Sequence, residues 1–146
     1  MTAAIGSAVI GKVAARLRAT FSEEQIHAEN VAPELAEKTG GAHYPAIHVY
    51  CDKVINDQVE KFRMFSGRVR ATVEVRHSHD RLDGLADAVE VLVDAVGDML
   101  AKSRGDWQDG MFYGGKYEVS FGPAKHGGKN FIQTAKVTFE IGVSKD

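Results

Sequence analysis

The sequence has one cysteine, three prolines and no long apolar run, and these shortages exclude several classes of protein. A lone Cys51 cannot form an internal disulfide. Because it alternates with Ile47 and Val49, we expect a buried free thiol rather than a nucleophile with a histidine partner. No segment approaches the ~18 consecutive apolar residues that a membrane-spanning helix needs. The N-terminal segment has basic residues from Lys12 onward and no uninterrupted apolar core, so we expect no signal peptide and synthesis in the cytoplasm.

A basic excess is also missing. Lys and Arg number 18 against 20 Asp and Glu, which gives a formal net charge of −2. Domains that bind nucleic acid usually carry a clear positive excess, so any contact with DNA is expected to be local or weak. The length of 146 residues and the 44% hydrophobic content suit one globular core. We therefore predict a single domain over residues 1–146.

Catalytic motifs are missing as well. The pieces Gly114-Gly115-Lys116 and Gly127-Gly128-Lys129 lack the rest of a phosphate-binding loop. His77 and His79 lie on one face of a predicted strand, beside Asp80, and could reach one metal ion, but no further ligand completes a site. We expect no catalytic residues, no metal and no cofactor. A small metal-dependent enzyme using these three residues is an alternative.

Two segments have helical periodicity. Apolar residues four apart, from Ile5 to Leu17, predict a helix over about residues 3–19. A longer amphipathic helix is predicted from about Asp80 to Ser103, with Asp80 and Asp83 in a capping box or Ser78 as the cap. Its apolar stripe consists of Leu82, Leu85, Ala86, Val89, Leu92, Val93, Val96 and Leu100.

The opposite side of this long helix is acidic. The residues at helical spacing are Asp83, Asp87, Glu90, Asp94 and Asp98, which we call the acidic face. Carboxylates at i and i+4 repel one another, and no Lys or Arg interrupts them before Lys102. The face is either a water-exposed side of the domain or a surface that meets a subunit or lines a channel.

Alternating residues predict three regions of strand. A strand starts at Pro45, covers residues 46–51 and gives way to a polar turn at 52–57. A long strand over 62–78 turns Val69, Ala71, Val73 and Val75 inward, with a bulge or bend at Gly67. Residues 117–121 and 134–141 predict a C-terminal hairpin. The fold class is α+β: a mainly antiparallel sheet packed by the long helix, with an additional N-terminal helix.

Basic residues gather in two places. Arg63, Arg68, Arg70 and Arg76 lie along the long strand. They are either a solvated face with salt bridges to neighbouring acids or a surface for another subunit or a tube; a cytoplasmic binding module using this face is a further alternative. The connection 122–130 is longer than a tight turn and carries Lys125, His126 and Lys129, which suggests a projecting interface tip. Residues 21–43 are predicted to be a long arm that a partner could order.

The order of these elements resembles the tail terminator, or tail-completion, proteins of long-tailed bacteriophages. The likeness is carried by residues 44–50 (YPAIHVY), by 67–76 and by the helix containing 82–100. It implies a structural virion protein of the neck, made in the host cytoplasm. Such a subunit forms a hexameric ring, caps the tail tube protein, joins the head-side connector protein and lets DNA pass through its lumen without catalysis. An acidic lumen would repel passing DNA, which suits the acidic face. Another head–tail joining or head-completion subunit is the nearest alternative.

Overall fold

The computed structural model describes residues 2–22, 25–28, 45–127 and 130–146. Its helices and strands, in chain order, are α1 (Thr2–Leu17), β1 (Ile26–His27), β2 (Ala46–Asn56), β3 (Phe65–His79), α3 (Leu82–Lys102), β4 (Gly105–Gln108), β5 (Met111–Phe121), β6 (Lys125–Gly127) and β7 (Asn130–Lys145). The predicted α+β class is confirmed.

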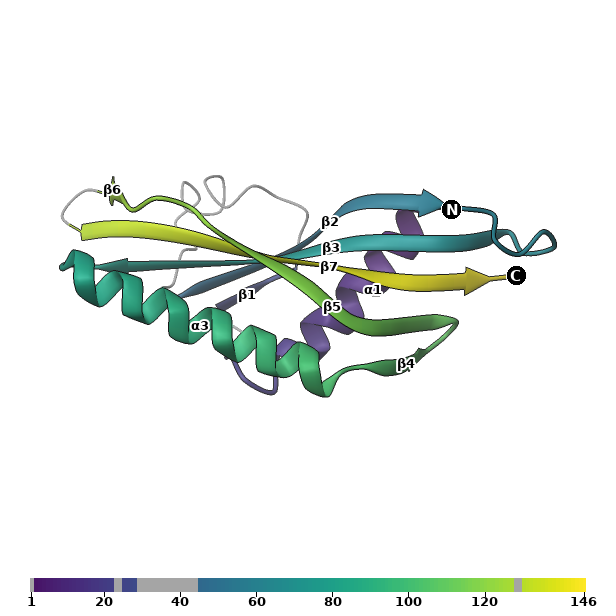
Figure 1. Ribbon diagram of the computed structural model, residues 1–146, viewed down its shortest axis with the longest axis horizontal. Coiled ribbons are helices and arrows are strands. Elements are labelled where there is room, and N and C mark those ends of the chain that lie inside the picture. The colour runs from purple at the N-terminus through teal and green to yellow at the C-terminus, as the bar shows by residue number, and fades with distance from the viewer. Residues whose placement is uncertain (1, 23–24, 29–44, 128–129) are drawn as a thin grey trace.

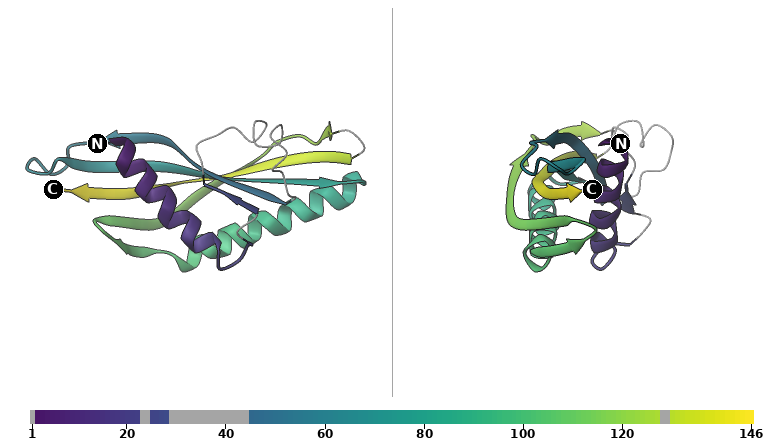
Figure 2. Two further views of the ribbon diagram at one scale, coloured as in Figure 1. Left: turned by 180° about the vertical axis from the view of Figure 1, so that it is seen from behind. Right: turned by 90° about the vertical axis from the view of Figure 1, so that its right-hand side faces the viewer.

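The strands form one curled sheet in the order β1-β2-β3-β7-β5-β4, with β6 also paired to β7. β1 runs parallel to β2, and the remaining pairs are antiparallel. Both helices lie on the same face, α1 beneath one half of the sheet and α3 beneath the other, and the edge with β4 and β5 curls around them (Figures 1 and 2). The molecule is therefore elongated along its strands.

One apolar core fills the space between the helices and the sheet. The odd-numbered residues of β3 from Val69 to Val75 point into it, as predicted, and those of β7 from Ala135 to Val143 meet them from the neighbouring strand. The buried residues of α3 recur at three- and four-residue steps and pack on this layer. Leu82 and Ala86 were wrongly assigned to that stripe, because both are exposed.

The start of α3 also differs from the prediction. The helix begins at Leu82, its N-cap is Arg81, and no side chain caps it, so the capping box of Asp80 and Asp83 does not form. Asp83 instead accepts hydrogen bonds from the backbone N–H of Gly84 and from the Arg81 guanidinium. An acid in the first turn still interacts favourably with the positive end of the helix dipole.

Several strand predictions are corrected. β2 continues to Asn56, so the predicted turn at 52–57 is wrong, and the bulge lies between Cys51 and Lys53 instead of at Gly67. Gly67 is required for another reason, because a Cβ there would collide with the carbonyl oxygen of Ile55. Cys51 is only half-buried at the edge of the core.

The C-terminal strands do not form a separate hairpin. β7 pairs with β5 as predicted, but it also pairs along its length with β3, so it is an interior strand of the sheet. β4, with the buried Trp107, was not predicted. Of the proposed arm at 21–43, Phe21 is buried and 26–27 form β1, while residues 23–24 and 29–43 lie outside the described residues.

Candidate interaction surfaces

The residues of the alternative metal site lie at the end of β3. His79 Nδ1 accepts a hydrogen bond from the backbone N–H of Arg81 and lies 3.1 Å from a carboxylate oxygen of Asp80. His77 is half-buried, and burial lowers its pKa, with a smaller contribution from the charge of His79. Within the described ranges, no three His, Cys, Asp or Glu side chains are grouped so that they could hold a metal ion.

The outer face of the sheet carries a ladder of polar contacts across β2, β3 and β7. Glu74 is 4% exposed, accepts a hydrogen bond from the hydroxyl of Tyr50 and lies 3.8 Å from the Lys136 ammonium. Thr72 donates to Asp52 and also lies within hydrogen-bond distance of Thr138. These strands therefore hold much of their polar surface in internal contacts.

The predicted arginine surface takes part in this ladder. Arg68 pairs with Asp57 and Glu140, and these carboxylates raise its pKa. Arg70 pairs with Asp52. Exposed pairs of this kind add little to stability, but they reduce the positive charge that the face can offer to a partner.

The other two arginines of the set lie on either side of Arg68 and Arg70 in the sequence. Arg63 belongs to the loop between β2 and β3 and pairs with Glu60 and Asp146. Arg76 is half-buried near the other end of β3. The four arginines therefore do not form one continuous basic patch.

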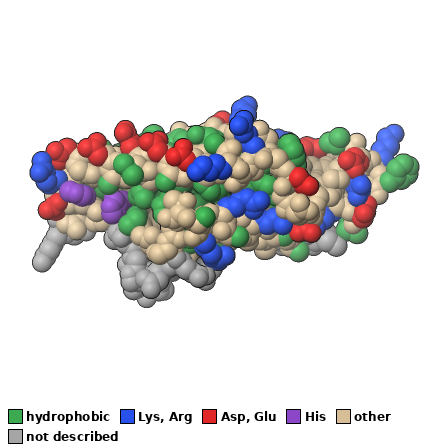
Figure 3. Space-filling view, turned by 90° about the horizontal axis from the view of Figure 1, so that it is seen from below, with side chains coloured by type: hydrophobic (Ala, Val, Ile, Leu, Met, Phe, Trp, Pro, Cys, Tyr) green, Lys and Arg blue, Asp and Glu red, His purple; other side chains and the backbone are tan. Residues whose placement is uncertain are grey.

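The acidic face keeps the geometry that the sequence predicts. All five of its acids are exposed on α3, and Figure 3 shows the acidic side chains as a row over that helix. Asp83 pairs with Arg81. Among the described residues, the other four, Asp87, Glu90, Asp94 and Asp98, make no ion pair. Their repulsion is therefore not offset within the described part of the chain.

Residues of the predicted C-terminal tip are placed only in part. Lys125 and His126 lie in β6, which extends the edge next to β7, and the His126 ring contacts Phe131 with centroids 4.9 Å apart. Lys129 lies outside the described residues. The two described basic residues therefore belong to a paired strand and not to an open loop.

One surface was missed from the sequence: the loop of residues 57–64 between β2 and β3, which we call the hairpin tip. Phe62 is fully exposed there, and Val59 and Met64 are 77% and 56% exposed. Their numbering gave a usable signal. Core residues of β3 from Phe65 to Val75 are odd-numbered. The predicted strand over 62–78 would therefore turn the even-numbered Phe62 and Met64 away from that core.

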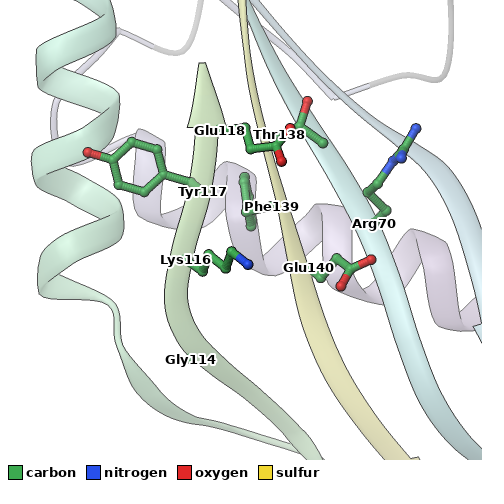
Figure 4. A pocket seen from close by; sticks show the side chains of 8 residues that line it. All are labelled: Arg70, Gly114, Lys116, Tyr117, Glu118, Thr138, Phe139 and Glu140. Atoms are coloured by element: carbon green, nitrogen blue, oxygen red, sulfur yellow. The ribbon is translucent and has the colours of Figure 1, made fainter. Parts of the chain in front are cut away.

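A shallow hollow of about 330 Å³ lies where β5 departs from regular pairing with β7 (Figure 4). Arg70, Lys116, Glu118 and Glu140 contribute its charged side chains, while Tyr117 points away toward α3. Arg70 and Glu140 already bind residues of the ladder. Of its charged side chains, Lys116 and Glu118 are the two without an ion pair to another described residue.

None of the helices in the described ranges has the length and apolar character that crossing a bilayer requires. A comparison with known proteins gives no match to a family model and none to a curated protein.

Proposed function

We propose that this protein is a ring-forming structural subunit of the neck of a long-tailed bacteriophage. Its role would be that of a tail terminator: a hexameric ring that caps the tail tube protein, presents a surface to the head-side connector protein and lets DNA pass. The protein would then be made in the host cytoplasm and be found in the virion. Another head–tail joining or head-completion subunit is the closest variant of this role.

The observation that carries the proposal is a set of large apolar side chains exposed on ordered elements of a small domain. Phe62 and Val59 project from the hairpin tip, Val91 from α3, and Phe112 and Phe121 from β5. Exposed apolar surface that is held in place by secondary structure is typical of protein interfaces. A ring subunit needs at least two such surfaces, because each copy contacts two neighbours.

The resemblance to tail terminators is the reason for proposing that the assembly is a ring of the phage neck. Its three segments correspond to β2, to the middle of β3 and to α3, with residue 44 outside the described residues. The α+β arrangement agrees with it at the level of fold class. The acidic face adds physical support, because exposed carboxylates repel DNA and would limit its adhesion to a lumen.

The competing binding module is less well supported. It needs an available basic surface around Arg68 and Arg70, and both guanidinium groups are occupied by carboxylates of the same chain. A partner would have to displace Asp57 or Asp52 before it could use them. Reversing these two charges should therefore perturb the sheet face itself more than binding to a partner.

The test is assembly in the presence of the tail tube protein encoded by the same genome. Sedimentation and negative-stain images should give rings of a single size that sit on tube ends and stop tube growth. Ring subunits can stay monomeric until they meet their target, so the tube protein belongs in the experiment. A chain that remains monomeric at every concentration, and leaves tube length unchanged, contradicts the proposal.

A further inference from the structure

We propose that neighbouring copies join head to tail, with the hairpin tip of one copy seated on the acidic face of the next around Val91. This pairing rests on the proposed ring function and names the two surfaces that close the ring. The binding partner of the tip is therefore a second copy of the same chain.

The hairpin tip is held in a fixed shape. The side-chain oxygen of Asn56 accepts hydrogen bonds from the backbone N–H groups of Gln58 and Ser66, at 3.2 and 3.1 Å. The backbone N–H of Glu60 donates to the Ser66 hydroxyl at 2.8 Å. Glu60 also accepts from Arg63 and from the hydroxyl of Ser144 on β7. A loop tied at so many points loses little further entropy on binding.

This rigid loop presents Phe62 with its side chain wholly in solvent. Among the described residues, the apolar core does not include that ring, and the core of β3 begins at Phe65. Aromatic side chains held in this way supply most of the affinity at many interfaces. Beside the loop lies a hollow of about 200 Å³, whose lining includes Ala4, Ala8 and Met64 together with Lys145 and Asp146.

This end of the molecule carries charges of both signs, and Arg63 is shared by Glu60 and Asp146. Asp57, Glu60 and Arg63 all have ion-pair partners. Within the described ranges, Lys61 and Lys145 make no ion pair. The tip therefore combines an aromatic anchor with the cation of Lys61. The pKa of the Asp109 carboxyl is lowered by Lys12 and, to a smaller extent, by the charge of Lys145, so Lys145 also acts within its own chain. Such a tip fits a surface that is apolar at one point and acidic around it.

The acidic face has that composition. Val91 is 67% exposed, and helical spacing puts it next to Asp87 and Asp94. These two acids, with Glu90 and Asp98, are the carboxylates of α3 that lack ion pairs among the described residues. Cations from another copy would relieve their mutual repulsion.

The two surfaces lie toward opposite ends of the molecule. Figure 3 shows the acidic row toward one end of the long axis and, toward the other end, exposed hydrophobic side chains among basic and acidic ones. The hairpin tip follows the end of β2, far along the sheet from α3 (Figure 1). Two different surfaces that complement one another make a heterologous contact, which repeats until the rotation closes.

The decisive experiment uses two variants, Phe62→Asp in the tip and Val91→Asp on α3. Each alone should lower self-association by roughly 30-fold or more, the scale of losing an interface hot spot. Each variant keeps one intact surface, the acidic face in the first and the tip in the second. A mixture should therefore give a one-to-one dimer in sedimentation, while neither variant forms rings on the tail tube protein.

Charge exchange gives a second measurement on the same pairing. Lys61→Glu with Lys145→Glu should prevent assembly, as should Asp87→Lys with Asp94→Lys, and a mixture of these two proteins should recover association. Glu118→Lys, at an exposed acid of β5 that belongs to neither surface, is the matched control and should leave rings intact. Circular dichroism checks that every variant is folded.

The possible failures are distinguishable. If the wild-type chain forms rings on tubes and Phe62→Asp forms them equally well, the pairing is wrong and the ring function stands. The pairing is equally wrong if the mixed variants stay monomeric while the wild-type chain forms rings. If the wild-type chain itself never assembles with the tube protein, the ring function is overturned and the pairing with it.

Discussion

The guanidinium carbon of Arg16 lies 4.0 Å from the ring centroid of Trp107, which joins the end of α1 to β4. The Trp107 ring is buried, packs against Tyr113 and donates a hydrogen bond to the carbonyl of Ser103. This one contact therefore ties together the first helix, the end of α3 and the curled edge of the sheet.

Replacing Trp107 with Ala should lower the free energy of unfolding by ~3–5 kcal/mol, the usual cost of removing a buried aromatic side chain. Arg16→Met keeps most of the side-chain stem and removes the cation, so it should cost ~1 kcal/mol. Urea denaturation followed by circular dichroism measures both. Phe112→Ala, on an exposed β5 aromatic, should change stability by no more than ~0.5 kcal/mol. Equal losses for Trp107 and Phe112 would contradict the buried position.

Two helical glycines should respond oppositely to alanine. Gly11 of α1 has open space where a Cβ would lie, so Gly11→Ala should stabilise the protein by ~0.5–1 kcal/mol through helix propensity. At Gly97 of α3, a Cβ would come within 2.8 Å of the Tyr117 hydroxyl. Gly97→Ala should therefore lose that gain unless Tyr117→Phe removes the hydroxyl. Thermal unfolding of the single and double variants tests this, and an equal gain at both glycines would contradict the contact.

The sequence predicted the elements whose pattern is strong and local. Both helices, the core phase of β3 and the pairing of β5 with β7 follow from periodicity, because each buries one face against a single core. β4 escaped prediction, since four residues are too few to show a period. The continuation of β2 through Asp52 was missed because a bulge there interrupts the alternation.

The candidate surfaces were likewise predictable where local spacing determines them and not where the sheet register does. The acidic face was predictable because helical spacing alone brings its carboxylates together. Salt bridges of the arginines to neighbouring acids were one of the two interpretations of the sequence, and the pairs of Arg68 and Arg70 agree with it. The identity of the acids was not predictable, since they come from β2, β7 and the hairpin tip, which only the sheet register brings near. The exposure of Phe62 lay within reach of the sequence, through the phase of β3.

The bulge in β2 should matter for stability. It lets Asp52 accept hydrogen bonds from the buried hydroxyl of Thr72 and from the Arg70 guanidinium. Asp52→Ala leaves the Thr72 hydroxyl with Thr138 as an acceptor and the Arg70 guanidinium with solvent, so it should cost ~1 kcal/mol in urea denaturation, the net value of the lost hydrogen bonds. Glu118→Ala is the matched control, because this exposed acid on β5 makes no hydrogen bond or ion pair with other described residues. Similar small changes for both variants would show that the ladder contributes little.

The half-buried His77 should make stability depend on pH. Burial lowers its pKa in the folded protein below the ordinary value of 6.5, and its Nδ1 is a buried atom without a hydrogen-bond partner in the described part of the chain. The unfolded chain therefore binds the proton more tightly. Stability from this group is complete above about pH 6.5 and declines as the pH falls toward the folded-state pKa.

His77→Gln removes the titration, so its free energy of unfolding should fall less than that of the wild type between about pH 7.5 and pH 5.5. Urea denaturation at closely spaced pH values measures this difference, because the acids common to both proteins contribute equally and cancel. Parallel curves for the wild type and His77→Gln would mean that His77 takes up its proton as readily in the folded protein as in the unfolded chain.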